Sequence, residues 1–120
     1  MAVRGIRGAI TVERDTKDAI ISATKKLLFA ILEANRTLAR EDICSVIFTA
    51  TEDIQTAFPA EAAREIGWDT VPLLCSREIP VVNALPKCIR ALIHWNTEIH
   101  QSEVQHVYLE GAVKLRPDLN

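Results

Sequence analysis

The chain has 120 residues, enough for one compact domain with a hydrophobic core. Hydrophobic residues make up 48% of it and charged residues 25%, and no Gly/Ser/Pro-rich tract or block of like charge interrupts it, so we expect residues 1–120 to form a single globular domain. The formal net charge of −2 argues against partners recruited by overall charge, so no nucleic acid or anionic membrane is expected.

A first strand is predicted over Val3–Val12, where apolar residues alternate with others. Ile6 and Ile10 share one face of this strand, which we expect to face the core. Arg7 lies on the other face among small residues, and this leaves room for a ligand to approach its guanidinium. The alternative is an ordinary solvent-exposed arginine.

A helix is predicted over Lys17–Ala34, with Asp15 or Thr16 as its N-cap. Apolar residues recur along it at helical spacing and form a broad stripe. Asn35 is a suitable terminator. We expect this helix to be scaffold rather than part of a site.

Two shorter elements follow. Cys44–Ala50 is rich in Val, Ile and Phe and is predicted to be a buried strand. Phe58–Gly67 has Pro59 near its start and a glycine at its end, which indicates a short helix. Arg64 lies near the C-terminus of that helix, where the helix dipole favours a cation, so capping is the ordinary interpretation of this residue.

The most informative stretch lies between two further apolar runs. The apolar run Val71–Leu74 comes first, and a strand is predicted over Cys88–Thr97 after it. Three prolines in this region predict irregular backbone between the strands. The stretch brings Cys75, Glu78 and Arg90 close in sequence, and loops held between strands often carry sites. Alternation places Arg90 on the more polar face of its strand. The alternative for Glu78 and Arg90 is a solvated ion pair.

The last predicted strand is Gln105–Leu109, followed by a turn and a tail over Gly111–Asn120. Charges within Met1–Arg7 stand where a signal peptide would be apolar, and Leu27–Leu32 is far too short to span a bilayer. We therefore expect a soluble, cytoplasmic protein.

Several common catalytic signatures are absent from the sequence. It has no Gly-rich phosphate loop, no GxSxG elbow and no set of His, Cys and Asp residues at metal-ligand spacing. Its three cysteines include no CxxC pair, which indicates reduced thiols rather than a disulfide framework. We therefore expect no cofactor and no metal, and an enzyme with this sequence would need little acid–base or covalent chemistry.

The remaining polar candidates are cations and one phenol. They lie on predicted strand faces, in the short helix or in the tail: Arg7, Arg64, Arg90, Tyr108 and Arg116. A guanidinium matches a carboxylate with two parallel hydrogen bonds, and a tyrosine hydroxyl adds an uncharged donor. Glu78 could accept a hydrogen bond from a ligand hydroxyl. The residues thus support a site for a small carboxylate, without identifying a reaction.

Several ordered motifs resemble one known family. They are Arg4–Ala9 with Thr11–Glu13, Ala50–Thr51, Phe58–Ala60, Cys75 with Glu78, Lys87–Arg90, His106–Glu110 and Leu115–Leu119. Over nearly the whole chain the sequence resembles the AroH class of monofunctional chorismate mutases. The resemblance implies an α+β fold, with a mixed β-sheet packed with helices on one side, in a homotrimer with a barrel-like β core and active sites between subunits.

The reaction implied by the resemblance is the conversion of chorismate to prephenate, a [3,3] rearrangement in aromatic amino-acid biosynthesis. By similarity, Arg7 and Tyr108 would hold a carboxylate, Arg90 would donate to the ether oxygen, and Glu78 and Cys75 would bond the ring hydroxyl. The pocket would be lined by Phe58, Ala60, Leu74 and Leu115, with Arg64 and Arg116 near its mouth.

Two points qualify this interpretation. Glu61 stands where members of the family tend to carry lysine, which would weaken local attraction for a dianion. Cys75 and Glu78 have opposite parity on a regular strand, so both can face one ligand only if the backbone bends. The mutase interpretation also expects Arg7 from across a subunit boundary, beside Arg90. The rival hypotheses are a non-catalytic trimer that binds a small carboxylate and a related trimeric imine hydrolase.

Overall fold

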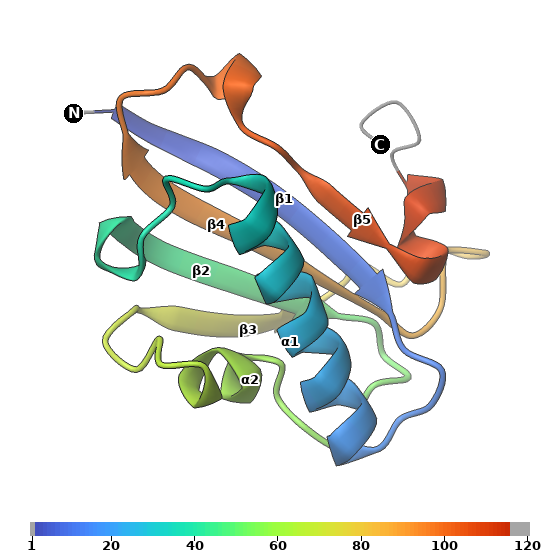
Figure 1. Cartoon of the computed structure of the whole chain (residues 1–120). Helices are drawn as coiled ribbons and strands as arrows, with labels where there is room; N and C mark the ends of the chain where they lie inside the picture. The colour runs from blue at the N-terminus through green and yellow to red at the C-terminus, as the bar shows by residue number, and fades with distance from the viewer. Residues whose placement is uncertain (1, 116–120) are drawn as a thin grey trace.

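A computed structural model describes residues 2–115 of the chain. Five strands form one mixed sheet in the order β3-β2-β4-β1-β5 (Figure 1). The strands are β1 Ala2–Thr11, β2 Ile43–Ala50, β3 Leu73–Arg77, β4 Cys88–Thr97 and β5 Val107–Leu109. The helices are α1 Lys17–Ala34 and α2 Ala60–Glu65, with 3-10 turns at Arg40–Asp42, Gln101–Glu103 and Glu110–Leu115. The predicted α+β class, with a mixed sheet, is confirmed.

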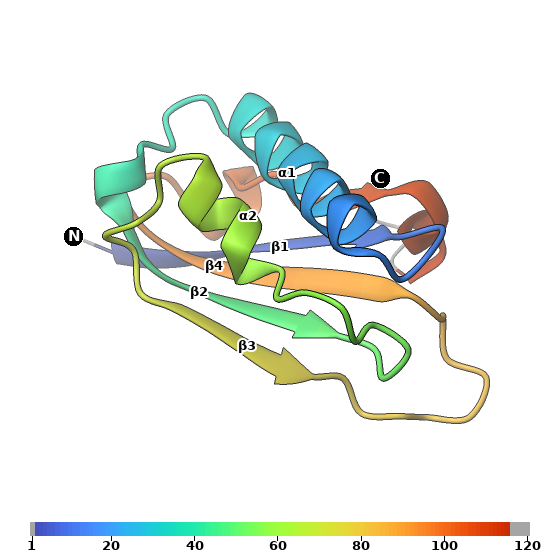
Figure 2. The same ribbon diagram turned by 90° about the horizontal axis from the view of Figure 1, so that it is seen from below.

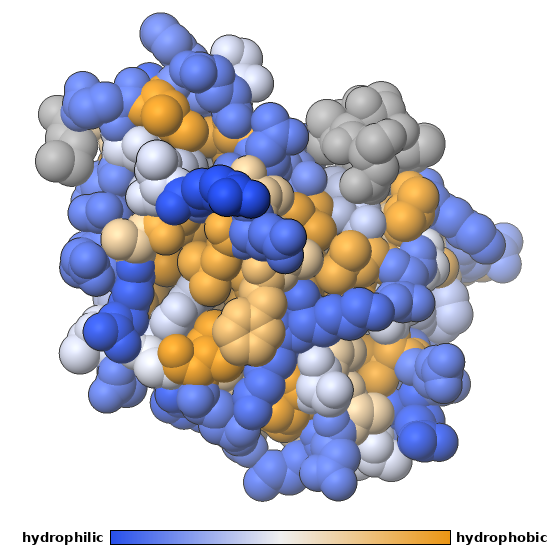
Figure 3. All heavy atoms as spheres, viewed as in Figure 1, coloured by the Kyte–Doolittle hydropathy of each residue, from blue (hydrophilic) through white to orange (hydrophobic). Residues whose placement is uncertain are grey.

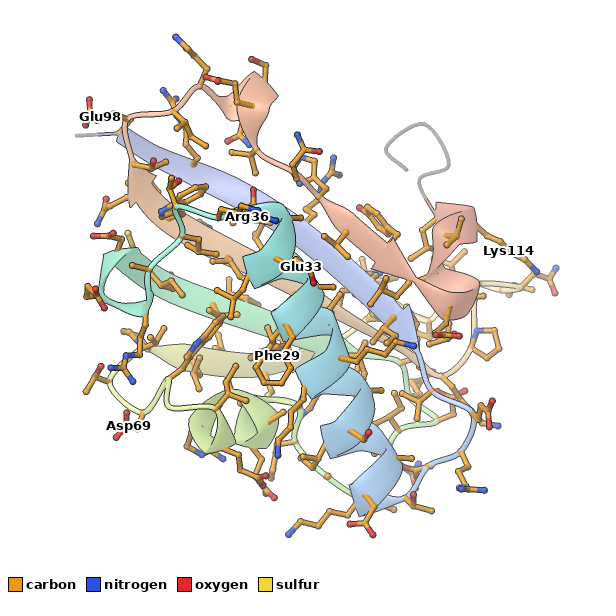
Figure 4. All side chains as sticks on the ribbon, viewed as in Figure 1. Phe29, Glu33, Arg36, Asp69, Glu98 and Lys114 are labelled. Atoms are coloured by element: carbon orange, nitrogen blue, oxygen red, sulfur yellow. The ribbon has the colours of Figure 1, made fainter. Side chains whose placement is uncertain are left out.

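Both α-helices lie on the same face of the sheet (Figure 2). Thr16 caps α1 by accepting a hydrogen bond from the Ala19 amide, so Thr16 rather than Asp15 is the N-cap. Asn35 ends the helix, and its side chain donates to the carbonyl oxygens of Ile31 and Gln105. The apolar stripe of α1 is buried against the sheet, while Phe29 and Glu33 remain exposed (Figure 4).

The two long strands β1 and β4 form the antiparallel centre of the sheet and are paired from Ala2 with Thr97 to Thr11 with Cys88. Their inner side chains, including Ile6, Ile10 and Ile93, are completely or almost completely buried under the helices. The buried face of β1 therefore matches the face predicted from its alternation. Figure 3 shows the helix-bearing side, where hydrophilic residues surround smaller apolar areas.

Two predicted boundaries shift in the structure, and one strand is less buried than predicted. The helix predicted over residues 58–67 is shorter, Ala60–Glu65, and Gly67 follows it with a φ of +97° that suits glycine. The strand predicted from Val71 begins at Leu73 because the preceding Pro72 has no amide to donate to a sheet ladder. In β2 only alternate residues are buried, so one of its faces is open in this chain.

Gly8 allows α1 to approach β1 closely. A Cβ added there would lie 2.7 Å from Ile31 Cδ1 and 3.2 Å from Leu27 Cδ1. We expect Gly8→Val to lower the free energy of unfolding by about 1–3 kcal/mol, because added methyl groups overpack this contact. The shift of the urea unfolding midpoint measures the effect, and an unchanged midpoint would contradict close packing at this position.

Among residues 2–115 the second face of the sheet carries no α-helix, and the 3-10 turn Glu110–Leu115 packs against one end of it. Its side chains are a mixture of polar and apolar groups, several of them exposed: Val3, Arg7, Ile47, Thr49, Leu74, Arg90, Leu92 and His94. Val3 is 56% exposed and Leu74 is 61% exposed. In the described part of the chain, no helix is long and apolar enough to cross a membrane.

Candidate active site

A pocket of about 380 Å³ opens on the helix-free face of the sheet. We call it the arginine pocket. Strands β1, β2, β4 and β5, the segment after β3 and the end of the last 3-10 turn contribute its lining: Arg7, Gly8, Ile47, Thr49, Glu78, Arg90, Ala91, Leu92, Tyr108 and Leu115. Five residues selected from the sequence therefore meet in one pocket, namely Arg7, Glu78, Arg90, Tyr108 and Leu115.

Arg90 and Glu78 form an ion pair within the arginine pocket. Arg90 Nε lies 3.3 Å from Glu78 Oε2, and the same carboxylate oxygen accepts a hydrogen bond from the Thr49 hydroxyl. Sheet register explains this arrangement, because Thr49 is paired with Arg90 on one side and with Ser76 on the other. The Arg90 side chain is 45% exposed, so its guanidinium is held in place yet remains open to a ligand.

Arg7 and Tyr108 close the other side of the pocket. Parallel pairing of β5 with β1 sets Tyr108 opposite Ala9, two residues from Arg7 on the same face. The Arg7 amide donates to His106 Nδ1 at 2.9 Å, which ties the start of β5 to β1. Tyr108 is 6% exposed. The mutase interpretation expects Arg7 from across a subunit boundary, but Arg7 and Arg90 line the arginine pocket of a single chain, so no second subunit is needed to bring these two side chains together.

Thr49 was missed as a site residue by sequence reasoning. Alternation along β2 fixes which face it occupies, but no signal in the sequence shows that β3 and β4 flank β2. The strand order therefore had to be known before Thr49 could be placed beside Glu78 and Arg90.

Phe58 and Cys75 line a second pocket of about 500 Å³, which we call the α2 pocket. Lys17, Glu61 and Arg77 also contribute to it. Cys75 packs against the main hydrophobic core, on the helix-bearing side of β3. Regular strand parity thus holds over β3, and one chain does not bring Cys75 to Glu78 at the arginine pocket.

Three further candidates lie outside the arginine pocket. Ala60 is buried in α2, and Arg64 is exposed near the end of that helix. Leu74 lies on the helix-free face but is not among the residues that line the pocket. Arg116 lies outside the described residues.

Glu61, the residue that departs from the family pattern, is paired with a cation. Lys17 Nζ lies 3.2 Å from Glu61 Oε2, and both residues line the α2 pocket. The side chain of Lys17 is 64% exposed. The lining of the α2 pocket therefore includes an ammonium group, supplied by the first turn of α1, beside the negative charge at position 61.

Cys88 lies beneath the arginine pocket in a small cluster with Ala9 and Tyr108. Burial raises the pKa of its thiol to about 11, with Glu78 and Asp53 adding to the rise against the lowering effect of Arg90. At neutral pH this thiol is protonated and is a poor nucleophile. Among the described residues, no group of three or more His, Cys, Asp or Glu side chains is placed to hold a metal ion.

The raised pKa of Cys88 predicts a loss of stability in alkali. The unfolded thiol ionises near pH 8.5, whereas the folded thiol stays neutral to about pH 11, so stability falls as pH rises through this window. Between pH 8 and pH 10.5 we expect the free energy of unfolding to fall by about 2 kcal/mol more in the parent protein than in Cys88→Ala. Urea titrations at both values measure this difference, and equal falls would contradict the expectation.

The arginine pocket offers two guanidinium groups, a phenol and one anchored carboxylate. Such a set can hold a carboxylate, accept from a ligand hydroxyl and place a fixed positive charge beside an oxygen atom. Fold and site together thus define an α+β protein with a pocket whose side chains suit a small, oxygen-rich anion.

The chain belongs to the type I chorismate mutase family, whose family model matches residues 3–119. It is 60% identical to chorismate mutase AroH of Thermus thermophilus over 117 residues, which cover 98% of this chain and 96% of that protein. It is 48% identical to chorismate mutase AroH of Bacillus subtilis strain 168 over 121 residues, covering 100% of this chain and 94% of that protein. The solved chorismate mutase from Clostridium thermocellum matches with a TM-score of 0.87 and 48% identity, over 90% of this chain and 96% of that chain.

Proposed function

We propose that this protein is an isomerase that converts chorismate to prephenate in the arginine pocket, in aromatic amino-acid biosynthesis. Family membership supports the reaction. The observation that carries the assignment of the site is the Arg90–Glu78 pair, in which a guanidinium is fixed at an open pocket wall. The reaction is a unimolecular [3,3] rearrangement, and the proposed mechanism uses only side chains of the protein.

In this mechanism the protein stabilises charge that develops during the reaction. As the C–O bond of the ether breaks, negative charge grows on its oxygen, and Arg90 donates a hydrogen bond to that atom. Because the charge is larger in the transition state than in the substrate, this bond lowers the barrier more than it tightens binding. Arg7 and Tyr108 hold a carboxylate, and Glu78 accepts from the ring hydroxyl. Together they keep the substrate in its folded, reactive conformation.

We further propose that the site is completed by a neighbouring subunit in a homotrimer. One chain divides the expected substrate contacts between the arginine pocket and the α2 pocket, which holds Phe58 and Cys75. The helix-free face also leaves apolar residues such as Leu74 exposed, and association between copies would cover them. In the trimer, the α2 pocket wall of one subunit, with Arg64 nearby, would face the arginine pocket of the next, and Leu115 would line the shared cleft.

The direct test is the loss of chorismate absorbance with the purified protein, without added metal or nucleotide. We expect first-order loss at low substrate concentration and the appearance of prephenate as the sole product. A protein that binds chorismate without consuming it would be a carboxylate-binding protein, and the proposed function would then be wrong.

A further inference from the structure

The turn after β2, residues 51–54, is attached to the strand that leads to Glu78. The Glu78 amide donates to the last carbonyl oxygen of β2 at 3.1 Å. One nitrogen of the Arg77 guanidinium, Nη1, donates to the carbonyl oxygens of Thr51 at 2.6 Å and Ile54 at 2.8 Å. These hydrogen bonds therefore fix the position of the Glu78 backbone relative to the turn.

The same turn also holds the start of β4, which leads to Arg90. The Lys87 amide donates to both carboxylate oxygens of Asp53, at 3.1 and 3.0 Å, and the Cys88 amide donates to Thr51 Oγ1 at 3.0 Å. The Thr51 hydroxyl in turn donates to Asp53. Lys87 has a φ of +47°, a left-handed conformation that non-glycine residues seldom adopt, and the Asp53 carboxylate stabilises it.

We propose that Asp53 and Thr51 are positioning residues for the Arg90 guanidinium, an inference that rests on the proposed function of the arginine pocket. Neither residue lines that pocket, so they act through β4 rather than on the substrate. Arg90 lies two residues after Cys88 and on the same face of the strand. A change in backbone direction at Lys87 and Cys88 therefore moves the guanidinium relative to Glu78 and to the ether oxygen.

Positioning of Arg90 and simple stabilisation of the surface turn predict different effects on kcat. Stabilisation alone changes the fraction of folded protein and leaves the turnover of each folded molecule unaltered. Positioning lowers kcat, because a displaced donor meets the developing charge poorly, while KM changes little since Arg7 and Tyr108 still bind the carboxylate. Its effect also requires that Arg90 be present.

The test is a double-mutant cycle of Asp53→Ala with Arg90→Ala, with kcat and KM measured on folded protein. We expect Asp53→Ala to lower kcat by about tenfold or more with little change in KM. We expect no further loss when Asp53→Ala is added to Arg90→Ala, since the positioned group is gone. An unchanged kcat, or an equal loss in both backgrounds, would overturn the proposal.

Thr51 supplies a second, milder pair of variants in case Asp53→Ala does not fold. Thr51→Val removes the hydroxyl and should lower kcat, whereas Thr51→Ser keeps it and should restore kcat to near the parent value. Equal kcat in the two variants would also overturn the proposal. Glu103→Ala is the matched control, because this exposed carboxylate likewise accepts from a loop amide, that of His100, outside the arginine pocket.

The positioning of Arg90 can also be tested without measuring turnover. If the parent protein left chorismate unchanged, the position of Arg90 could still be followed by the NMR signal of its Nε–H group. A shift of that signal in Asp53→Ala, but not in Glu103→Ala, would support positioning without any reference to turnover. An unshifted signal would contradict it.

Discussion

Replacing Arg90 with lysine is expected to lower kcat by about 10²–10³-fold, the usual loss when one donor to a developing oxyanion is removed. Lysine keeps the positive charge, but its ammonium is a point charge that cannot reproduce the planar fork of the guanidinium. Arg90 Nε lies 3.3 Å from the Glu78 carboxylate, and Nε is an atom that lysine lacks. Loss of this contact releases the cation from its fixed position beside the ether oxygen.

The Michaelis constant should change much less than kcat in this variant, because the carboxylate is held by Arg7 and Tyr108. Steady-state kinetics with chorismate separates the two parameters. Arg40→Lys is a suitable control, since Arg40 also makes a directed contact, to the Gly67 carbonyl oxygen at 2.7 Å, but lies outside the arginine pocket. A rise in KM with kcat unchanged would assign Arg90 to substrate binding alone.

Local patterns in the sequence were sufficient to predict most elements of the fold. Alternation predicted the buried face of β1 and the full span of β4, and helical spacing with a capping threonine predicted α1. The order of the strands was not predictable in the same way, because pairing of β5 with β1 joins residues about 100 positions apart. No local propensity reports such a contact.

The candidate site shows the same division between local and long-range information. The faces occupied by Arg7 and Arg90 follow from strand parity alone, and both predictions are confirmed. The contact between Glu78 and Thr49 depends on the neighbours of β2 and so could not be predicted. Strand parity also predicted that Cys75 and Glu78 lie on opposite faces of a regular strand. The structure keeps that separation within one chain.

This separation leads to the second large expected effect, which is recovery of activity by mixing two inactive proteins. Arg90→Ala removes the guanidinium that the mechanism needs in the arginine pocket. The double variant Phe58→Ala with Arg64→Ala removes two side chains that a neighbouring subunit is proposed to contribute to the same site. If neighbouring subunits build each site, co-refolded mixtures contain some sites with both halves intact. Random assembly at equal amounts should give about a quarter of the parent activity.

The matched control mixes Arg90→Ala with Arg7→Ala. Both substitutions fall in the arginine pocket of one chain, so every mixed site formed by them retains a defect and no recovery is expected. Chorismate turnover of the mixtures, compared with that of each variant alone, measures the effect. Equal turnover in the two mixtures would mean that Phe58 and Arg64 do not complete the site of a neighbour. The arginine pocket would then have to act with the residues of its own chain, and the exposed apolar side chains of the helix-free face would need another explanation.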